Sequence, residues 1–76
     1  MKWENYIVTN SEILIGKPII KGTRLSVEFI LGLLADGWTE KKIFDNYPQL
    51  KRVHIQAALA FASEVIKDER FYPVKV

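Results

Sequence analysis

The sequence predicts a mainly α-helical fold, in which a short N-terminal β element precedes a three-helix core with a helix–turn–helix outline. Three observations lead to this fold class. Residues 51–67 hold the longest uninterrupted pattern with helical periodicity. Two shorter helical patterns precede it, and each follows a residue type that caps helices. Short β-branched and aromatic runs occur within the first 25 residues.

The size and composition of the chain indicate one small domain. Its 76 residues lie near the lower limit at which a single core folds unaided. We divide it into a β arm or hairpin (residues 1–25), a three-helix core (26–67) and a tail (68–76). Because the chain has no cysteine and one histidine, we expect neither a disulfide nor a metal site. Oligomerisation is the remaining common means of stabilising such a domain, and we predict a homodimer.

The charge balance permits nucleic-acid binding without requiring it. The net charge is +2 at pH 7, and the isoelectric point is about 9.0. No apolar run approaches the roughly 20 residues that span a bilayer, and the first ten residues lack the apolar core of a signal peptide. We therefore expect a cytoplasmic protein with no membrane contact and no cofactor.

The β element is predicted from three short apolar runs. Residues 3–8 are rich in aromatic and β-branched side chains and predict a short strand or a packed arm. Residues 13–15 and 19–20 flank the turn formers Gly16 and Pro18, which predicts a hairpin or an open turn. Strands this short need something to pack against.

The boundaries of the first two helices follow from capping residues. Ser26 and Thr39 are suitable N-caps, because their hydroxyls accept hydrogen bonds from early helix amides. Gly37 is expected to end the first helix in a left-handed conformation. Pro48 is expected to stop the second, because the residue before a proline disfavours helical angles.

The third helix is apolar around most of its circumference. Its polar side chains occupy one narrow face and are Arg52, Gln56, Ser63 and Lys67. An ordinary surface helix needs an apolar stripe of roughly 100°, and this helix shows about twice that. We therefore expect its own helices to cover one side and a second subunit or partner to cover another.

The second helix, the turn holding Pro48 and the third helix suggest DNA binding, because the first residues of the last helix in a helix–turn–helix unit reach base edges. Here those residues are Lys51, Arg52, Ile55 and Gln56. Arginine pairs with guanine and glutamine with adenine, while lysine neutralises phosphate. The alternative is an ordinary solvated face, since many helical domains contain such a turn.

Residues 16–62 resemble a small prokaryotic family named domain of unknown function 433. That family has the pattern G-K-P-x-I-x-G-T-R-[IL]-x-V, a helix, a glycine before an [ST]-x-x-[EK] helix, Y-P-x-L, and a final alanine-rich helix. The matching residues are Gly16, Lys17, Pro18, Ile20, Gly22, Thr23, Arg24, Leu25, Val27, Gly37, Thr39, Tyr47, Pro48, Leu50, Ala57, Ala58 and Leu59. One departure is Lys51, where the family usually carries a threonine or serine that caps the last helix.

The resemblance implies a homeodomain-like three-helix fold and an antitoxin of a type II toxin–antitoxin pair. Such members are often encoded beside a PIN-like ribonuclease toxin. The expected partners are a second copy, the ribonuclease and double-stranded DNA. The alternatives are a DNA-binding regulator without a toxin partner and a protein-interaction module that binds no nucleic acid.

Several other residues have either a structural or a functional interpretation. Gly16, Pro18 and Pro48 are expected to shape turns, and Gly22 to adopt an angle closed to other residues. Thr23 and Arg24 are expected to bond to nearby backbone or to Glu28 or Asp45.

His54 is expected to be partly buried and hydrogen-bonded. A catalytic role would need a partner that the sequence does not supply, so we predict no enzyme activity. Phe71 and Tyr72 either contact a toxin or fold back onto the third helix.

Overall fold

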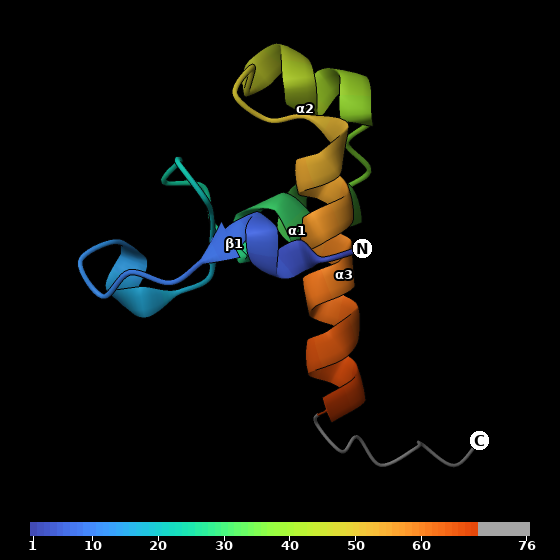
Figure 1. Ribbon diagram of the computed structural model, residues 1–76. Helices are drawn as coiled ribbons and strands as arrows, with labels where there is room; N and C mark the ends of the chain where they lie inside the picture. Colours follow the sequence, from blue (N-terminus) through green and yellow to red (C-terminus); the bar gives the residue numbers. More distant parts are fainter. Residues whose placement is uncertain (69–76) are drawn as a thin grey trace.

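The computed structural model describes residues 1–68 and confirms a mainly helical fold with a short N-terminal β element (Figure 1). Two short 3₁₀ helices, η1 and η2, accompany two strands and three α-helices. The elements in chain order are η1 (Trp3–Asn5), β1 (Ile7–Val8), η2 (Leu14–Gly16), β2 (Ile19–Ile20), α1 (Val27–Ala35), α2 (Glu40–Asn46) and α3 (Arg52–Asp68). Phe71 and Tyr72, predicted to contact a partner, lie outside the described residues.

The two strands form a small antiparallel sheet, in which Ile7 pairs with Ile20 and Val8 with Ile19. The strand predicted within residues 3–8 is confirmed, whereas, of the two alternatives predicted for residues 13–20, the hairpin is wrong. Residues 14–16 instead form the tight turn η2, in which Leu14 and Ile15 have positive φ angles of 51° and 55°. The pairing that forms joins residues eleven and thirteen positions apart, which periodicity alone does not reveal.

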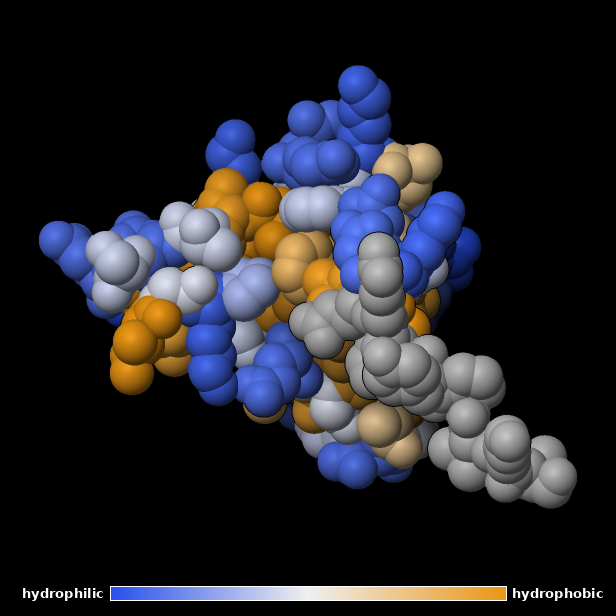
Figure 2. Space-filling model, turned by 90° about the horizontal axis from the view of Figure 1, so that it is seen from below, coloured by the Kyte–Doolittle hydropathy of each residue, from blue (hydrophilic) through white to orange (hydrophobic). Residues whose placement is uncertain are grey.

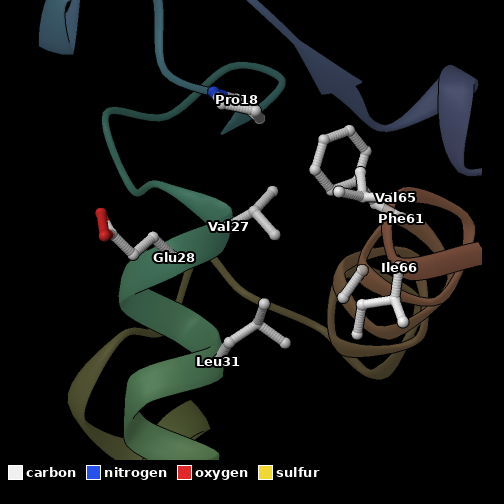
Figure 3. Close-up of a pocket in the computed structure, with 8 residues that line it drawn as sticks. Pro18, Val27, Glu28, Leu31, Phe61, Val65 and Ile66 are labelled. Atoms are coloured by element: carbon white, nitrogen blue, oxygen red, sulfur yellow. The ribbon is translucent and has the colours of Figure 1, made fainter. Parts of the chain in front are cut away.

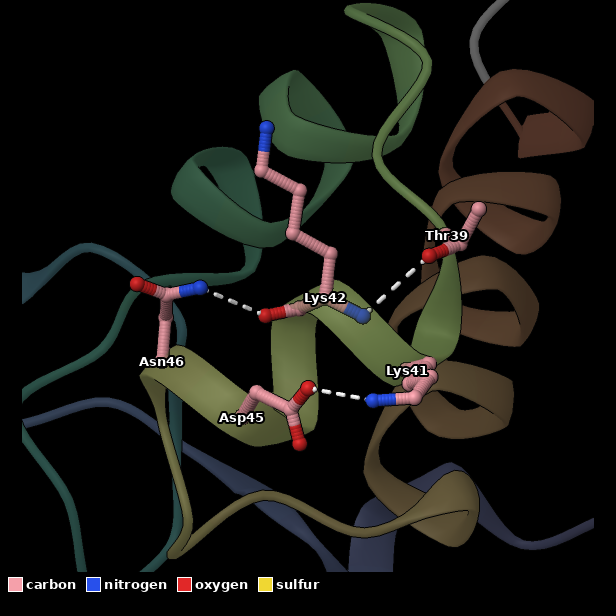
Figure 4. Close-up of polar contacts among 5 residues, drawn as sticks. All are labelled: Thr39, Lys41, Lys42, Asp45 and Asn46. Atoms are coloured by element: carbon pink, nitrogen blue, oxygen red, sulfur yellow. Dashed lines mark hydrogen bonds and ion pairs between the residues drawn. The ribbon is translucent and has the colours of Figure 1, made fainter.

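The predicted ends of the first two helices are confirmed. The Ser26 hydroxyl accepts from the Phe29 amide at 2.9 Å, and the Thr39 hydroxyl accepts from the Lys42 amide at 3.1 Å (Figure 4). Gly37 follows α1 with a φ of 87°, a conformation that glycine adopts without steric cost. Each helix thus begins with a satisfied amide and stops where the sequence predicts.

The core lies where α1 and β2 meet α3. Its fully buried large side chains are Ile20, Ile30 and Ile43. Ala57 and Ala58 of α3 are completely buried, and their small side chains leave room for neighbouring elements to lie close. On another side of α3, the Trp3 ring of η1 packs edge-on against Phe61 with centroids 4.9 Å apart. Figure 1 shows the N-terminal segment crossing beside α3.

The segment after β2 has the structural role predicted for Thr23 but not the one predicted for Arg24. The Thr23 hydroxyl donates to the Ile20 carbonyl at 2.8 Å and accepts from the Leu25 amide at 3.0 Å. Arg24 is exposed. The two acids expected to bind it pair with other residues, Glu28 with Lys17 and Asp45 with Lys41, each at 2.8 Å.

Two other predicted turn residues also serve the fold. Gly16 has a φ of 76°, so it ends η2 in a conformation that favours glycine. The Pro18 carbonyl accepts from the Val27 amide at 2.9 Å. This bond ties the segment before β2 to the first turn of α1.

Candidate functional site

Exposed basic side chains gather where α2 lies across the N-terminal end of α3 (Figure 1). We call this region the basic end and define it by Lys41, Lys42, Lys51, Arg52 and Gln56, all exposed. Four basic and two acidic residues lie between positions 40 and 52. Their excess of two positive charges equals the net charge of the whole chain. The positive and negative charges of all other residues therefore sum to zero.

Three of the four basic side chains already have a partner within the fold. Arg52 Nε lies 3.2 and 3.3 Å from the two carboxylate oxygens of Glu40. Lys41 pairs with Asp45 (Figure 4), and the Lys42 ammonium lies 4.2 Å from the centroid of a ring of Trp38. Exposed contacts of this kind contribute about 0–1 kcal/mol, so they can be exchanged for phosphate contacts at little cost.

His54 caps the backbone amide of Lys51 at the start of α3. The Lys51 amide donates to His54 Nδ1 at 2.9 Å, which is half of a capping box, with His54 in place of the usual glutamate or glutamine. Burial lowers the pKa of His54 below its ordinary value, and the Lys51 charge lowers it further. The neutral imidazole therefore remains available as an acceptor, and Lys51 is held at the start of α3.

Of the four residues predicted to face DNA, three are exposed and one is not. Lys51, Arg52 and Gln56 are exposed, whereas Ile55 is 4% exposed and belongs to the core. The prediction that the Ile55 side chain reaches DNA is therefore wrong. The apolar arc of α3 is so broad that the helical pattern alone did not show which apolar positions α1 covers.

A second surface lies beside the C-terminal half of α3. An apolar groove of about 280 Å³ separates α1 from the C-terminal half of α3. Val27 and Leu31 of α1 point across it toward α3, while Glu28 directs its carboxylate away (Figure 3). The lining residues are Pro18, Val27, Glu28, Leu31, Phe61, Ala62, Val65 and Ile66.

Three large apolar side chains of α3 remain exposed, and two of them, Val65 and Ile66, line this groove. Leu59 is 50% exposed, Val65 38% and Ile66 59%. In the view from below, Figure 2 shows hydrophobic side chains exposed between hydrophilic ones in the middle of this face. Within the described residues, α1 and η1 pack against two sides of α3, and these apolar side chains remain exposed between them and the polar face.

Residues 7–62 match the model of a family described as "Protein of unknown function (DUF433)". The chain belongs to this family. The matched region of this DUF433 chain runs from β1 to the middle of α3 and includes the whole basic end. The chain has no match among curated proteins or solved structures.

The sequence did not single out the tip of the loop before β2 in this DUF433 chain. Ile15 is 95% exposed and Leu14 45%, and both have left-handed backbone angles. A β-branched residue in that conformation is a genuine outlier, and such strain clusters at functional sites. The one signal in the sequence is an apolar run placed directly before Gly16.

Residues 1–68 of the DUF433 chain contain neither a metal-binding cluster nor a membrane-spanning helix. No group of three or more histidine, cysteine, aspartate or glutamate side chains there could hold a metal ion. In that same part, no helix combines the length and the apolar character that a membrane crossing requires. The candidate sites are the basic end, the apolar groove and the loop tip at Leu14 and Ile15.

Proposed function

We propose that this chain is an antitoxin-type regulator of the cytoplasm, which binds double-stranded DNA through its basic end and neutralises a PIN-like ribonuclease by direct binding. The observation that carries the DNA part is the exposure of Lys51, Arg52 and Gln56 on the first two turns of α3. With α2 lying across this end (Figure 1), the arrangement fits a helix–turn–helix unit, whose last helix enters the major groove.

The three side chains would contact different groups of the DNA, because their chemistry differs. Lys51 is a mobile positive charge that neutralises phosphate. Arg52 can leave its exposed pair with Glu40 and donate two hydrogen bonds to guanine, and Gln56 can bond bidentately to adenine. Because Gln56 lies one turn after Arg52, the two side chains reach neighbouring base pairs.

The toxin part rests on the family resemblance and is supported by one feature of the structure. The loop tip Leu14–Ile15 projects away from the helices in Figure 1 and exposes apolar side chains on a strained backbone. A partner that buries Ile15 gains apolar contact area. The mechanism would be stoichiometric, with one antitoxin chain blocking one ribonuclease.

DNA binding is tested by titrating duplex DNA from upstream of the gene over a salt series. We expect Lys51→Ala to weaken binding and to reduce the slope of log K against log salt by about one. Arg52→Ala should cost about 1–3 kcal/mol of binding free energy. Lys21→Ala, which removes an exposed charge in the turn after β2, should change affinity much less. Equal effects of all three variants would refute this assignment of the basic end.

Toxin binding is tested with the product of a neighbouring ribonuclease gene. We expect RNA cleavage to stop at one equivalent of the chain, and Ile15→Asn to require a clear excess. If the ribonuclease remains active while DNA binding is intact, the protein is a DNA-binding regulator without a toxin partner. If neither activity is found, it is a protein-interaction module with inherited architecture.

A further inference from the structure

We propose that the exposed apolar side of α3 is a dimer interface, against which α3 of a second copy packs antiparallel. The surface is the apolar seam, defined by Leu59, Ala62 and Ile66, together with the groove beside it. The inference deepens the proposed function, because it determines how two basic ends are presented to one DNA duplex. It rests on the proposed function only in that DNA step, and the dimer itself can be tested separately.

The spacing of the apolar seam suits a second helix. Ile55, Leu59, Ala62 and Ile66 follow one another at intervals of four, three and four residues, which is the alternation of a heptad repeat. Ile55 is buried inside the subunit, whereas Leu59 and Ile66 are about half exposed. The seam therefore starts in the core and continues onto the surface, where a helix from outside the subunit can complete the packing.

The apolar seam is complementary to itself when two copies run antiparallel. A two-fold axis near Ala62 places Leu59 opposite Ile66 of the partner subunit, and the reverse pair follows by symmetry. The small Ala62 side chains meet at the axis and allow the helices to approach closely. The larger side chains on either side then fill the groove against Val27 and Leu31 of α1.

The helix dipoles favour this orientation, because an antiparallel pair places the N-terminal half of each α3 beside the C-terminal half of the other. The residues that flank the seam near the axis, such as Ala58, Ser63 and Val65, carry no charge, and the flanking Arg52 lies about 15 Å along α3 from the axis, so no like charges are forced together.

The same arrangement matches the geometry of DNA. Arg52 lies ten residues before Ala62, which at about 1.5 Å per residue places the two copies of Arg52 about 30 Å apart along the pair. Half-sites one helical turn apart are about 34–36 Å from each other. On the helical wheel Arg52 and Gln56 lie on one flank of the seam. A two-fold axis perpendicular to both helices therefore places the Arg52 and Gln56 side chains of the two subunits on the same face of the dimer.

The position of the two-fold axis is tested by oxidative crosslinking. The chain has no cysteine, so each variant carries a single thiol. We expect Ala62→Cys to form a disulfide-linked dimer under mild oxidation, because its two thiols meet at the axis. Lys67→Cys, which is exposed and about 15 Å from its symmetry mate, should remain largely uncrosslinked. Equal crosslinking of both variants, or none of Ala62→Cys, would overturn the proposed packing.

The seam itself is tested by sedimentation equilibrium of the full chain. We expect Ile66→Lys to weaken the dimer at least 100-fold, while Asp68→Lys, on the opposite side of α3, leaves it unchanged. Both positions are exposed, so thermal melting should show both variants folded. A monomeric wild-type chain, or an Ile66→Lys dimer of unchanged stability, would overturn the inference. DNA binding by such a monomer would still leave the proposed function standing.

Discussion

His54 shows how a side chain within a helix can bind the backbone of the residue before it. Its Nδ1 accepts the Lys51 amide at a position where Lys51 has no short hydroxyl side chain to cap α3. The contact requires a neutral ring, and burial holds the pKa of His54 below its ordinary value of 6.5. An acidic medium therefore removes an interaction that the folded state uses and the unfolded state does not.

The predicted consequence is a loss of stability at low pH. Between the lowered folded-state pKa and 6.5, the unfolded chain binds a proton that the folded chain does not, so the free energy of unfolding rises with pH in this window. His54→Gln keeps an acceptor at the capping-box position and removes the titration. Urea denaturation at pH 5 and pH 7.5 should show a larger pH difference for the wild type than for His54→Gln, and equal differences would contradict this role.

Ile15 presents the opposite case, a residue that costs the fold stability. Its left-handed conformation costs a residue with a Cβ about 1–2 kcal/mol, and at 95% exposure its side chain gains almost nothing from burial. We expect Ile15→Asn to raise the free energy of unfolding by about 1 kcal/mol, because asparagine tolerates this conformation. Ile13→Asn, at a half-buried position with extended backbone, should lower it. Destabilisation by Ile15→Asn would show that the loop is not strained.

At the scale of elements, the sequence predicted the helices better than the sheet. Ser26, Gly37 and Thr39 act on bonds within one turn of themselves, so a local pattern contains the necessary information. The strand pairing depends on contacts between Ile7 and Ile20, and the turn formers Gly16 and Pro18 did not show whether residues 13–15 would form a strand or part of the turn. The predicted range of the third helix, residues 51–67, differs from that of α3 by one residue at each end.

The contact between α2 and α3 leads to a prediction about DNA affinity. Glu40 on α2 holds Arg52 on α3 and also places a negative charge at the surface proposed to meet phosphate. We expect Glu40→Gln to increase DNA affinity by about 1.5- to 5-fold. This range corresponds to the free energy that an exposed ion pair contributes. Fluorescence anisotropy measures the change.

Glu28→Gln is the matched control for that experiment. It also removes an exposed, ion-paired carboxylate, here the partner of Lys17, but at the start of α1 instead of the basic end. It should leave DNA affinity nearly unchanged. An equal gain in both variants would mean that net charge, and not the release of Arg52, controls binding.

For the whole molecule, α3 connects the core to two surfaces with different chemistry. Its first turns carry the basic end, its middle contributes buried alanines to the core, and its last turns expose the apolar seam. The sequence predicted the exposed polar face with Arg52 and Gln56, because charged and amide side chains define it clearly. It could not predict that Ile55 is buried, since burial within an almost wholly apolar arc depends on where α1 packs.

The most direct test of the account is a hydroxyl-radical footprint of the full chain on DNA from upstream of its gene. A dimer joined through α3 should protect two patches on one face of the duplex, separated by about one helical turn. Arg52→Ala should weaken protection at both patches together, because each copy contributes the same side chain. A single protected patch, or two patches at an unrelated spacing, would contradict the account that α3 both joins the two copies and contacts the DNA.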